Sequence, residues 1–402
     1  MYKVSSRFID AIKNSHTIVT QVEALDPFNN VREEIEITDA TFTQSWSDAV
    51  HRSGKCSLVD PLNTMIPLDA SHILSPFTTR LRGWSGIKFS DGTTELVPQG
   101  VYKIGDFDAN EKTSGSAAGG AKSIDLDLMD FSSQCQQPLD VAIGINGGTP
   151  LLSAIVALLT SAVPTMIFRM TGSTTFTVPG MLIREDQDVW VEATALAQAA
   201  GFDLLMDRDG ACGLVPRFGV AAQNYVWDFI EGPKAVFWNP GRKISADLYP
   251  NVVVVVGTNS QAPNVRAEAA DMDPTSATYV YGPYGRVVKT VKSTRVVSNA
   301  QAQQAANGIL TRLLGIAETA TFSCLPNPAL DIGDTVSITR ETMGLDHQLM
   351  LVTKIDHPGR AANEMVVTTQ RSVFTDEETA LSITGALTGI IAATAAGTPA
   401  AA

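Results

Sequence analysis

Acidic residues next to a glycine give the segment Asp207-Arg208-Asp209-Gly210 a potential for metal chemistry. Carboxylates at alternate positions before a glycine open the calcium loop of an EF-hand, which also needs further oxygen ligands and a bidentate Glu several residues later. The following residues 211–216 supply none of these. Asp-Gly is also a strong signal for a hairpin turn. We therefore predict a structural turn here and no calcium site.

Two histidines, His347 and His357, flank one predicted strand, and Asp346 or Asp356 could act as a further metal ligand beside them. A zinc or similar site usually has three or four protein ligands, often with two histidines on one helix face in an HxxxH spacing. That spacing is absent from this segment. We therefore expect these histidines to be surface or hydrogen-bonded residues.

Nucleophilic catalysis would need an activated serine or cysteine. Gly83-Trp84-Ser85-Gly86 lacks the second spacer residue of a GxSxG elbow, and it lies in an extended run instead of between a strand and a helix. The cysteines are far apart, form no CxxC pair and match no peptidase signature, so free buried thiols are expected. They are Cys56, Cys135, Cys212 and Cys324.

Paired carboxylates and a glycine-rich loop are the remaining candidates. Asp125 and Asp127 share one face of a strand whose other face is apolar, which predicts a solvated face. A glycosidase pair can be distant in sequence, so that class stays open. The loop at residues 144–148 (GINGG) lacks both the Lys-Ser/Thr of a P-loop and the full GxGxxG pattern, and predicts a connection between domains. We expect no catalytic, metal or cofactor site.

Length and composition indicate a multidomain globular protein. The 402 residues are 44% hydrophobic and 18% charged, which suggests two or three domains. Lys and Arg number 29 against 42 Asp and Glu, a net charge of −13. Tight nucleic-acid binding depends on basic residues that displace counterions from phosphates, so the acidic balance argues against such a binder. It mildly favours a conduit along which DNA passes without adhering.

Neither end of the chain indicates export or a membrane span. Residues 1–16 lack the apolar core of a signal peptide, and Val4, Phe8, Ile9 and Ile12 instead lie on one side of a short amphipathic helix. We expect synthesis and folding in a cytoplasm. The apolar run 151–163 is too short to cross a bilayer and ends at Pro164, which favours a buried helix. The weakly hydrophobic residues 381–402 predict a flexible or partner-docked tail.

Periodicity predicts a mainly β (α+β) chain: a first β-barrel or small sandwich, a small α+β insert, and a second β-barrel with one helix, followed by a short C-terminal tail. The domains are residues 1–137, 138–236, 237–375 and 376–402. Alternating apolar residues predict the strands. Asp-Gly pairs and Gly333, a residue type that readily adopts a positive φ, predict the turns. The predicted strands are 17–25, 31–38, one within 40–60, 79–89, 95–106, 122–129, 174–178, 202–206, 211–216, 251–257, 278–281, 286–291 and 317–324, with two or three more in 327–372.

Three helices besides the N-terminal amphipathic helix complete the prediction. One contains the apolar run 151–163 and opens at Thr149-Pro150, with Thr149 as N-cap and Pro150 at its first position. The second covers 185–200 and ends before Gly201. The third covers 298–314, capped by Ser298. Residues 113–121 predict an exposed loop, and the continuous Val run at 251–257 predicts a strand that is covered on both faces.

The order of four segments carries a family resemblance. These are residues 4–25 (VSSRFIDAIKNSHTIVTQVEAL), 79–108 with an Arg-bearing strand and a PQGVY phrase, 192–216 with a helix that ends at AAGF before DRDG, and 327–372 with DIGD before a strand. In this order they resemble central tail-hub (baseplate hub) proteins of tailed bacteriophages, particularly minor tail proteins from siphophages of actinobacteria. The residues after Phe374 lie outside the resemblance.

The resemblance implies a structural function. Two related hub barrels would alternate around a threefold axis, so that a homotrimer forms a pseudo-sixfold ring. Expected partners are the tail-tube or distal tail protein, the tail tip, spike or receptor-binding proteins, and the tape-measure protein. DNA would pass through during ejection, with no specific binding. The expected location is the virion tail, after assembly in the host cytoplasm, and no enzymatic activity is implied.

Three alternatives are compatible with the same residues. The hub of a contractile injection system or gene-transfer agent would carry the same segments. A tail-associated cell-wall hydrolase would need a catalytic domain, for which residues 376–402 are too short. A carbohydrate-binding protein could use Trp84, Trp190, Trp227 or Trp238 as stacking platforms, although the apolar neighbours of Trp190 favour core packing there.

Overall fold

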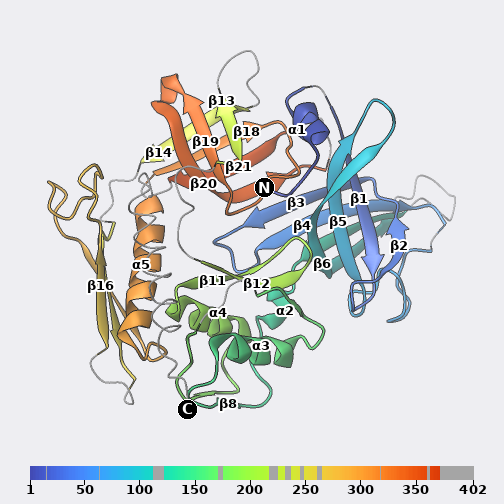
Figure 1. Cartoon of the computed structure of the whole chain (residues 1–402). Coiled ribbons are helices and arrows are strands. Elements are labelled where there is room, and N and C mark those ends of the chain that lie inside the picture. Colours follow the sequence, from blue (N-terminus) through green and yellow to red (C-terminus); the bar gives the residue numbers. More distant parts are fainter. Residues whose placement is uncertain are drawn as a thin grey trace, which may run out of the picture.

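The computed structural model describes residues 1–14, 16–62, 64–111, 122–170, 175–216, 225–230, 237–244, 249–259, 265–316, 318–359 and 363–371. Strands hold 46% of the chain and helices 16%, which confirms the prediction of a mainly β protein. In Figure 1, two groups of strands lie at the top and right, a helical part lies below them, and a narrow sheet with one long helix lies at the left.

The N-terminal strands form the first group, which we call the first half. Its strands alternate buried and exposed residues, as the period-two pattern predicts. The segment predicted to hold one strand within residues 40–60 is a hairpin of two strands. The elements are α1 (Ser6–Ile12), β1 (Thr17–Leu25), β2 (Val31–Ile35), β3 (Asp39–Ser45), β4 (Arg52–Asp60), β5 (Arg80–Lys88), β6 (Thr94–Glu111) and β7 (Lys122–Met129).

The C-terminal strands form the second half. Gly333 has the expected positive φ of 85° in the turn before β19. The buried Phe8 and Ile12 of α1 pack into the core of this half, so the N-terminus of the chain covers the C-terminal strands. The elements are β13 (Trp227–Ile230), β14 (Phe237–Ile244), β18 (Glu318–Cys324), β19 (Thr335–Arg340), η1 (Glu341–Met343), β20 (Leu345–His357) and β21 (Met365–Arg371).

The two halves repeat one strand order. Neighbouring strands follow β3-β4-β7-β6-β5-β1 in the first half and β14-β18-β21-β20-β19-β13 in the second. The halves join into one sheet because β20 also pairs with β3. Among the described residues no further pairing closes either half into a ring, so β2 and β14 end the path. One difference is that β1 runs antiparallel to β5, whereas β13 runs parallel to β19.

The insert packs helices on short strands. Helices α3 and α4 contact each other, and a common core holds Ile155, Leu158 and Leu196 together with Leu204 of the β11–β12 hairpin. The prediction for this hairpin is confirmed at both strands. The elements are α2 (Ser132–Cys135), β8 (Ile143–Ile145), α3 (Leu151–Ala162), β9 (Ile167–Phe168), β10 (Met181–Ile183), α4 (Val189–Ala199), β11 (Phe202–Met206) and β12 (Ala211–Pro216).

A side unit lies between β14 and β18 in sequence. It consists of β15 (Val252–Gly257), β16 (Arg266–Ala270), β17 (Val288–Ser293) and α5 (Asn299–Ile316). Helix α5 covers Val253 and Val255 on one face of β15, and Val280 covers Val252 and Val254 on the other. The prediction that β15 is covered on both faces is therefore confirmed. Ser298 also caps α5 as predicted, because its hydroxyl accepts from the Gln301 N–H.

Several local predictions need correction. Pro150 is the N-cap of α3, and the Thr149 hydroxyl instead donates to the Asn146 carbonyl. Residues 278–281 form turns, because the Asp271 carboxylate binds the hydroxyls of Ser276 and Thr278 and so competes with strand pairing. Helix α4 begins at Val189, since Asp188 caps it. In the predicted strand 174–178, Thr177 makes one isolated bridge to Pro150. The predicted loop 113–121 and tail 376–402 lie outside the described residues.

Candidate functional site at the junction of the halves and the insert

A group of charges joins the two halves and the insert, with two buried arginines around a partly exposed aspartate. Asp331 accepts from two arginines: Arg52 Nη2 lies 2.9 Å from its Oδ1, and Arg208 Nε lies 2.7 Å from its Oδ2. Both arginine side chains are only 4% exposed. Arg52 comes from the first half, Arg208 from the insert and Asp331 from the second half. We call these three residues the junction triad.

Local structure positions each member of the triad. Arg208 lies in the β11–β12 turn, where Asp207 Oδ1 accepts from the backbone N–H groups of Asp209 and Ala211. Asp331 begins the DIGD turn, in which Gly333 packs against the Trp46 ring so closely that a Cβ would overlap it. Its φ of 85° adds a second reason for glycine. Arg52 is the first residue of β4.

Backbone carbonyls accept further guanidinium hydrogens of both arginines. Arg208 Nη1 donates to the carbonyls of Pro98 (3.0 Å) and Pro328 (2.8 Å), and its Nη2 donates to Leu330 O. Arg52 Nε donates to Met206 O at 2.9 Å, so it also holds the insert hairpin. A buried guanidinium is stable only when such partners are present. The triad therefore ties loops that are separated by up to 279 residues.

The electrostatics of the triad are those of a static support. Burial by itself raises the pKa of Asp331, but the charges of Arg208 and Arg52 outweigh it and hold that pKa at about 2. Arginine does not lose its proton in proteins. No member can thus exchange a proton near neutral pH, so the arrangement positions backbone and does not perform acid–base chemistry.

His357 lies close to the triad at the end of β20. Its Nδ1 faces the carbonyl oxygen of Pro358 at 2.9 Å, and its Nε2 is buried without a partner. Burial lowers the pKa of His357 to about 4. A proton on Nε2 would place an unpartnered charge in the interior.

This geometry predicts acid sensitivity. The folded-state pKa of His357 lies below the usual 6.5, so the unfolded chain takes up this proton first as the pH falls. The contribution of His357 is complete above about pH 6.5 and is lost towards pH 4, on the order of 3 kcal/mol. Urea unfolding from pH 7 to 4 should show a shallower loss for His357→Asn than for the native chain. The exposed His347→Asn is the control and should keep the native slope.

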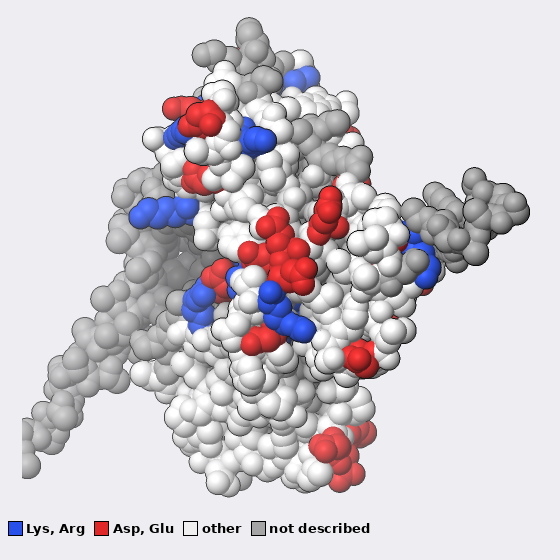
Figure 2. Space-filling view, turned by 90° about the vertical axis from the view of Figure 1, so that its right-hand side faces the viewer, with Lys and Arg blue, Asp and Glu red and all other residues white. Residues whose placement is uncertain are grey.

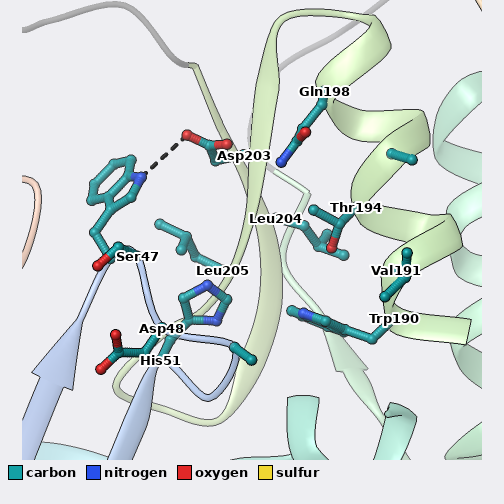
Figure 3. A pocket seen from close by; sticks show the side chains of 13 residues that line it. Ser47, Asp48, His51, Trp190, Val191, Thr194, Gln198, Asp203, Leu204 and Leu205 are labelled. Atoms are coloured by element: carbon teal, nitrogen blue, oxygen red, sulfur yellow. Dashed lines mark hydrogen bonds between the residues drawn. The ribbon is translucent and has the colours of Figure 1, made fainter. Parts of the chain in front are cut away.

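A cavity of about 360 Å³ lies beside the triad, between the β3–β4 loop and α4 (Figure 3). Trp46 Nε1 donates to Asp203 Oδ2 at 3.1 Å across one side. The rings of His51 and Trp190 lie 5.8 Å apart on another side. His51 Nδ1 and Thr194 Oγ1 are buried without a partner. The cavity is large enough for a small molecule or a side chain, and it offers hydrogen bonding and aromatic contact.

The residues first considered for metal chemistry have structural roles. Asp207 and Asp209 lie in the predicted hairpin turn and both form ion pairs with Arg169, which follows β9. Its Nη1 is 2.7 Å from Asp207 Oδ2 and 2.9 Å from Asp209 Oδ2. His347 and His357 are ten residues apart on β20, about 30 Å along a strand, and so do not share a site. Among the described residues, no three His, Cys, Asp or Glu side chains gather as a metal site.

The other candidates are likewise part of the framework. Ser85 is buried within β5, and Asp125 and Asp127 bind Ser57 and Lys55 across strands. The 144–148 segment forms β8 and the turn before α3. All four cysteines are free and buried, as predicted, and burial raises the pKa of Cys56 and Cys135 to about 12.

The tryptophans considered for carbohydrate stacking are spread over separate elements. Trp190 and Trp227 are buried in two different cores, which confirms the packing prediction for Trp190. Trp84 Nε1 donates to Glu23, and Trp238 Nε1 donates to Glu364. Trp46, which the sequence did not single out, is the tryptophan that reaches both the cavity and the DIGD turn.

Charge is mixed on the surface. In Figure 2, acidic and basic side chains lie side by side across the middle of the visible face, and much of the lower part is uncharged. That lower part corresponds to the insert, where the outer side of α3 carries Leu152, Val156 and small residues. Among the described residues, no helix has both the length and the hydropathy to span a membrane.

Sequence comparison and structure comparison give different results. No protein-family model matches the chain, and no curated protein matches it. The solved tail protein from Neisseria meningitidis MC58 superimposes with a TM-score of 0.58 at 12% identity, over 88% of this chain and 96% of that one. The 43 kDa tail protein of prophage MuSo2 from Shewanella oneidensis gives 0.56 at 14% identity, over 88% and 98%.

A chain of the Francisella PdpA–VgrG complex gives a TM-score of 0.52 at 8% identity, over 91% of this chain and 54% of that one. Identities this low establish the architecture alone. The match nevertheless extends over almost the full length of both tail proteins. The chain therefore has the fold of phage tail proteins.

Proposed function

We propose that the chain is a structural tail-hub protein that assembles as a homotrimer. Three copies form a pseudo-sixfold ring between the tail tube and the tail tip, and DNA passes through the ring during ejection. The repeated strand order of the two halves carries the proposal, because it lets three chains present six similar sheets. The fold shared with two tail proteins over most of each chain supports it.

The proposed action is mechanical. The ring supports the distal tail and opens a lumen once the tip engages a host, and the net charge of −13 suits a duct that does not retain DNA. The proposal places the protein in the virion tail after assembly in the host cytoplasm, with a siphophage of actinobacteria as its source. Its partners are the tail-tube or distal tail protein, the tip proteins and the tape-measure protein. It includes no catalytic step.

A contractile injection particle is the second candidate. The likeness to a chain of the PdpA–VgrG complex favours it. A hub of that kind would use the same duplicated sheets, so the two candidates differ in their neighbours and not in the ring itself.

Light scattering of the purified full chain tests the ring. We expect a mass of three times 42.8 kDa, alone or after mixing with the tail-tube protein, and a threefold ring about as wide as a tail tube in negative stain. A chain that stays monomeric in both conditions contradicts the proposal. Clearing of cell-wall substrate by such a monomer would instead support the hydrolase alternative.

A further inference from the structure

The contact between the two halves shows how a second copy can bind. In the second half, β20 pairs with β19 as far as Leu351, and β21 lies on its opposite side. After Leu351 the same edge of β20 pairs with β3 of the first half, which runs antiparallel to it from Lys354 to His357. Strand β3, the last strand of the first half, thus continues the pairing of β20 where β19 stops.

The equivalent position in the first half is open. Strand β6 corresponds to β20 in the repeated order, and it pairs with β5 as far as Lys103 while β7 lies on its opposite side. After Lys103 the edge of β6 that faced β5 has no strand partner among the described residues. Asp106, Asp108, Ala109 and Asn110 are exposed there. We call this stretch the β6 edge.

The strand that would fit this edge is also present. In the repeated order β14 corresponds to β3, since each ends its half and pairs with the next strand, β18 or β4. The outer side of β3 pairs with β20, whereas the outer side of β14 has no strand partner in the described part of the chain. Gly241, Lys243 and Ile244 of β14 are exposed, and Ile244 is 65% exposed.

We propose that β14 of one copy adds to the β6 edge of the next copy, antiparallel, as β3 adds to β20 within the chain. This inference rests on the proposed trimer and names the surfaces that close it. Charge supports the pairing, because the β6 edge carries Asp106 and Asp108 and β14 presents the exposed Lys243. Each copy offers one such edge and one such strand, so the contact is head-to-tail and can close into a ring.

The register follows from the repeat. Both central strands have an irregularity just after the flanking strand ends, between Val352 and Lys354 in β20 and between Ile104 and Phe107 in β6. With these aligned, Asp356 corresponds to Ala109, and following the ladders across each half from the same point makes Thr43 correspond to Ile244. The observed pair Thr43↔Asp356 therefore places Ile244 opposite Ala109. Lys243 then lies opposite Asn110 and diagonally next to Asp108 of the neighbouring copy.

A disulfide between copies tests this register. Residues directly opposite in an antiparallel pair have Cα atoms about 4.5–5.5 Å apart, which suits a disulfide. The full chain carrying Ala109→Cys and Ile244→Cys is oxidised and run on a non-reducing gel. The matched control carries Glu34→Cys and Ile244→Cys, because Glu34 is an exposed residue of β2 at the other end of the sheet. The four native cysteines are buried, and the single variants report their background.

We expect linked dimers and trimers in the Ala109/Ile244 variant, at roughly tenfold the level of either single variant, and their loss on reduction. A trimer by light scattering without this link, or with the link in the Glu34 control, overturns the β6–β14 contact and leaves the hub function standing. A link that produces ladders beyond three supports the contact and contradicts the closed trimer. A chain that stays monomeric overturns both.

Discussion

Replacing Asp331 with alanine should lower the free energy of unfolding by about 3–5 kcal/mol, the usual cost of removing one partner from a buried ion pair. The substitution leaves Arg52 and Arg208 charged, since arginine keeps its proton, and both side chains are nearly inaccessible to water. Urea unfolding at pH 7, followed by circular dichroism, measures the loss. Limited proteolysis should show early cleavage near the insert, because Arg208 links the insert to the second half.

The matched control is Asp127→Ala. Asp127 also pairs with a cation, at 3.3 Å from Lys55, but both side chains are well exposed. Exposed pairs contribute roughly 0–1 kcal/mol, so little change is expected. Equal effects of the two substitutions would mean that the junction triad is not a support of the fold.

Gly359→Ala is the second substitution with a large expected effect. Gly359 lies where β20 leaves its pairing with β3, and a Cβ at this position would overlap the carbonyl oxygen and backbone of Ala40. Its carbonyl also accepts from the Thr20 hydroxyl at 2.7 Å. Because the obstacle is backbone within a sheet, the two halves must separate locally, at a cost of about 1–3 kcal/mol or more. Thermal unfolding should show the loss as a lower Tm.

Gly144→Ala controls for the added methyl group. A Cβ at Gly144 meets no atom within 4 Å, and the residue does not have a positive φ. We expect a change within about 0.5 kcal/mol. If Gly359→Ala is as stable as Gly144→Ala, the backbones of Gly359 and Ala40 are not in close contact in solution. In the proposed ring, the same substitution should also alter assembly, since it changes how the two halves of each copy sit relative to each other.

The junction triad and the β3–β20 joint bear on the proposed function together. A ring that holds a tail tube and then opens must keep its parts in register under load. Within one chain, the triad fixes the insert and the DIGD turn to β4, and the sheet runs unbroken from β14 to β2. We expect opening to involve contacts between copies before contacts within a copy.

Short-range pattern was enough to predict most elements. Strand β1 and the hairpin β11–β12 have the bounds expected from alternation and turn residues. Alternation succeeds because one face of a strand is buried and the other solvated. It failed where side chains bind nearby backbone or hydroxyl groups, as at Asp271, since those local bonds compete with strand pairing.

The residues of the junction triad could not be recognised in the same way. Arg208 was visible only as a turn residue, and Arg52 had no local feature that distinguished it from other arginines at strand ends. Asp331 belonged to a noticed motif, but the motif indicates a turn and not a partner. The closest partners are 123 and 279 residues apart in sequence. A spacing rule applies to residues on one element and does not extend over such distances.

Local residue patterns suffice to predict the elements, their buried faces, the need for glycine at a position such as Gly333, and the order of segments that resembles tail-hub proteins. They do not predict which strands pair, and above all not that β20 pairs with β3. The physical reason is that backbone hydrogen bonds are the same for every strand partner. Local pattern states which side of a strand is apolar, and only the packing of the whole chain selects the neighbour that covers its edge.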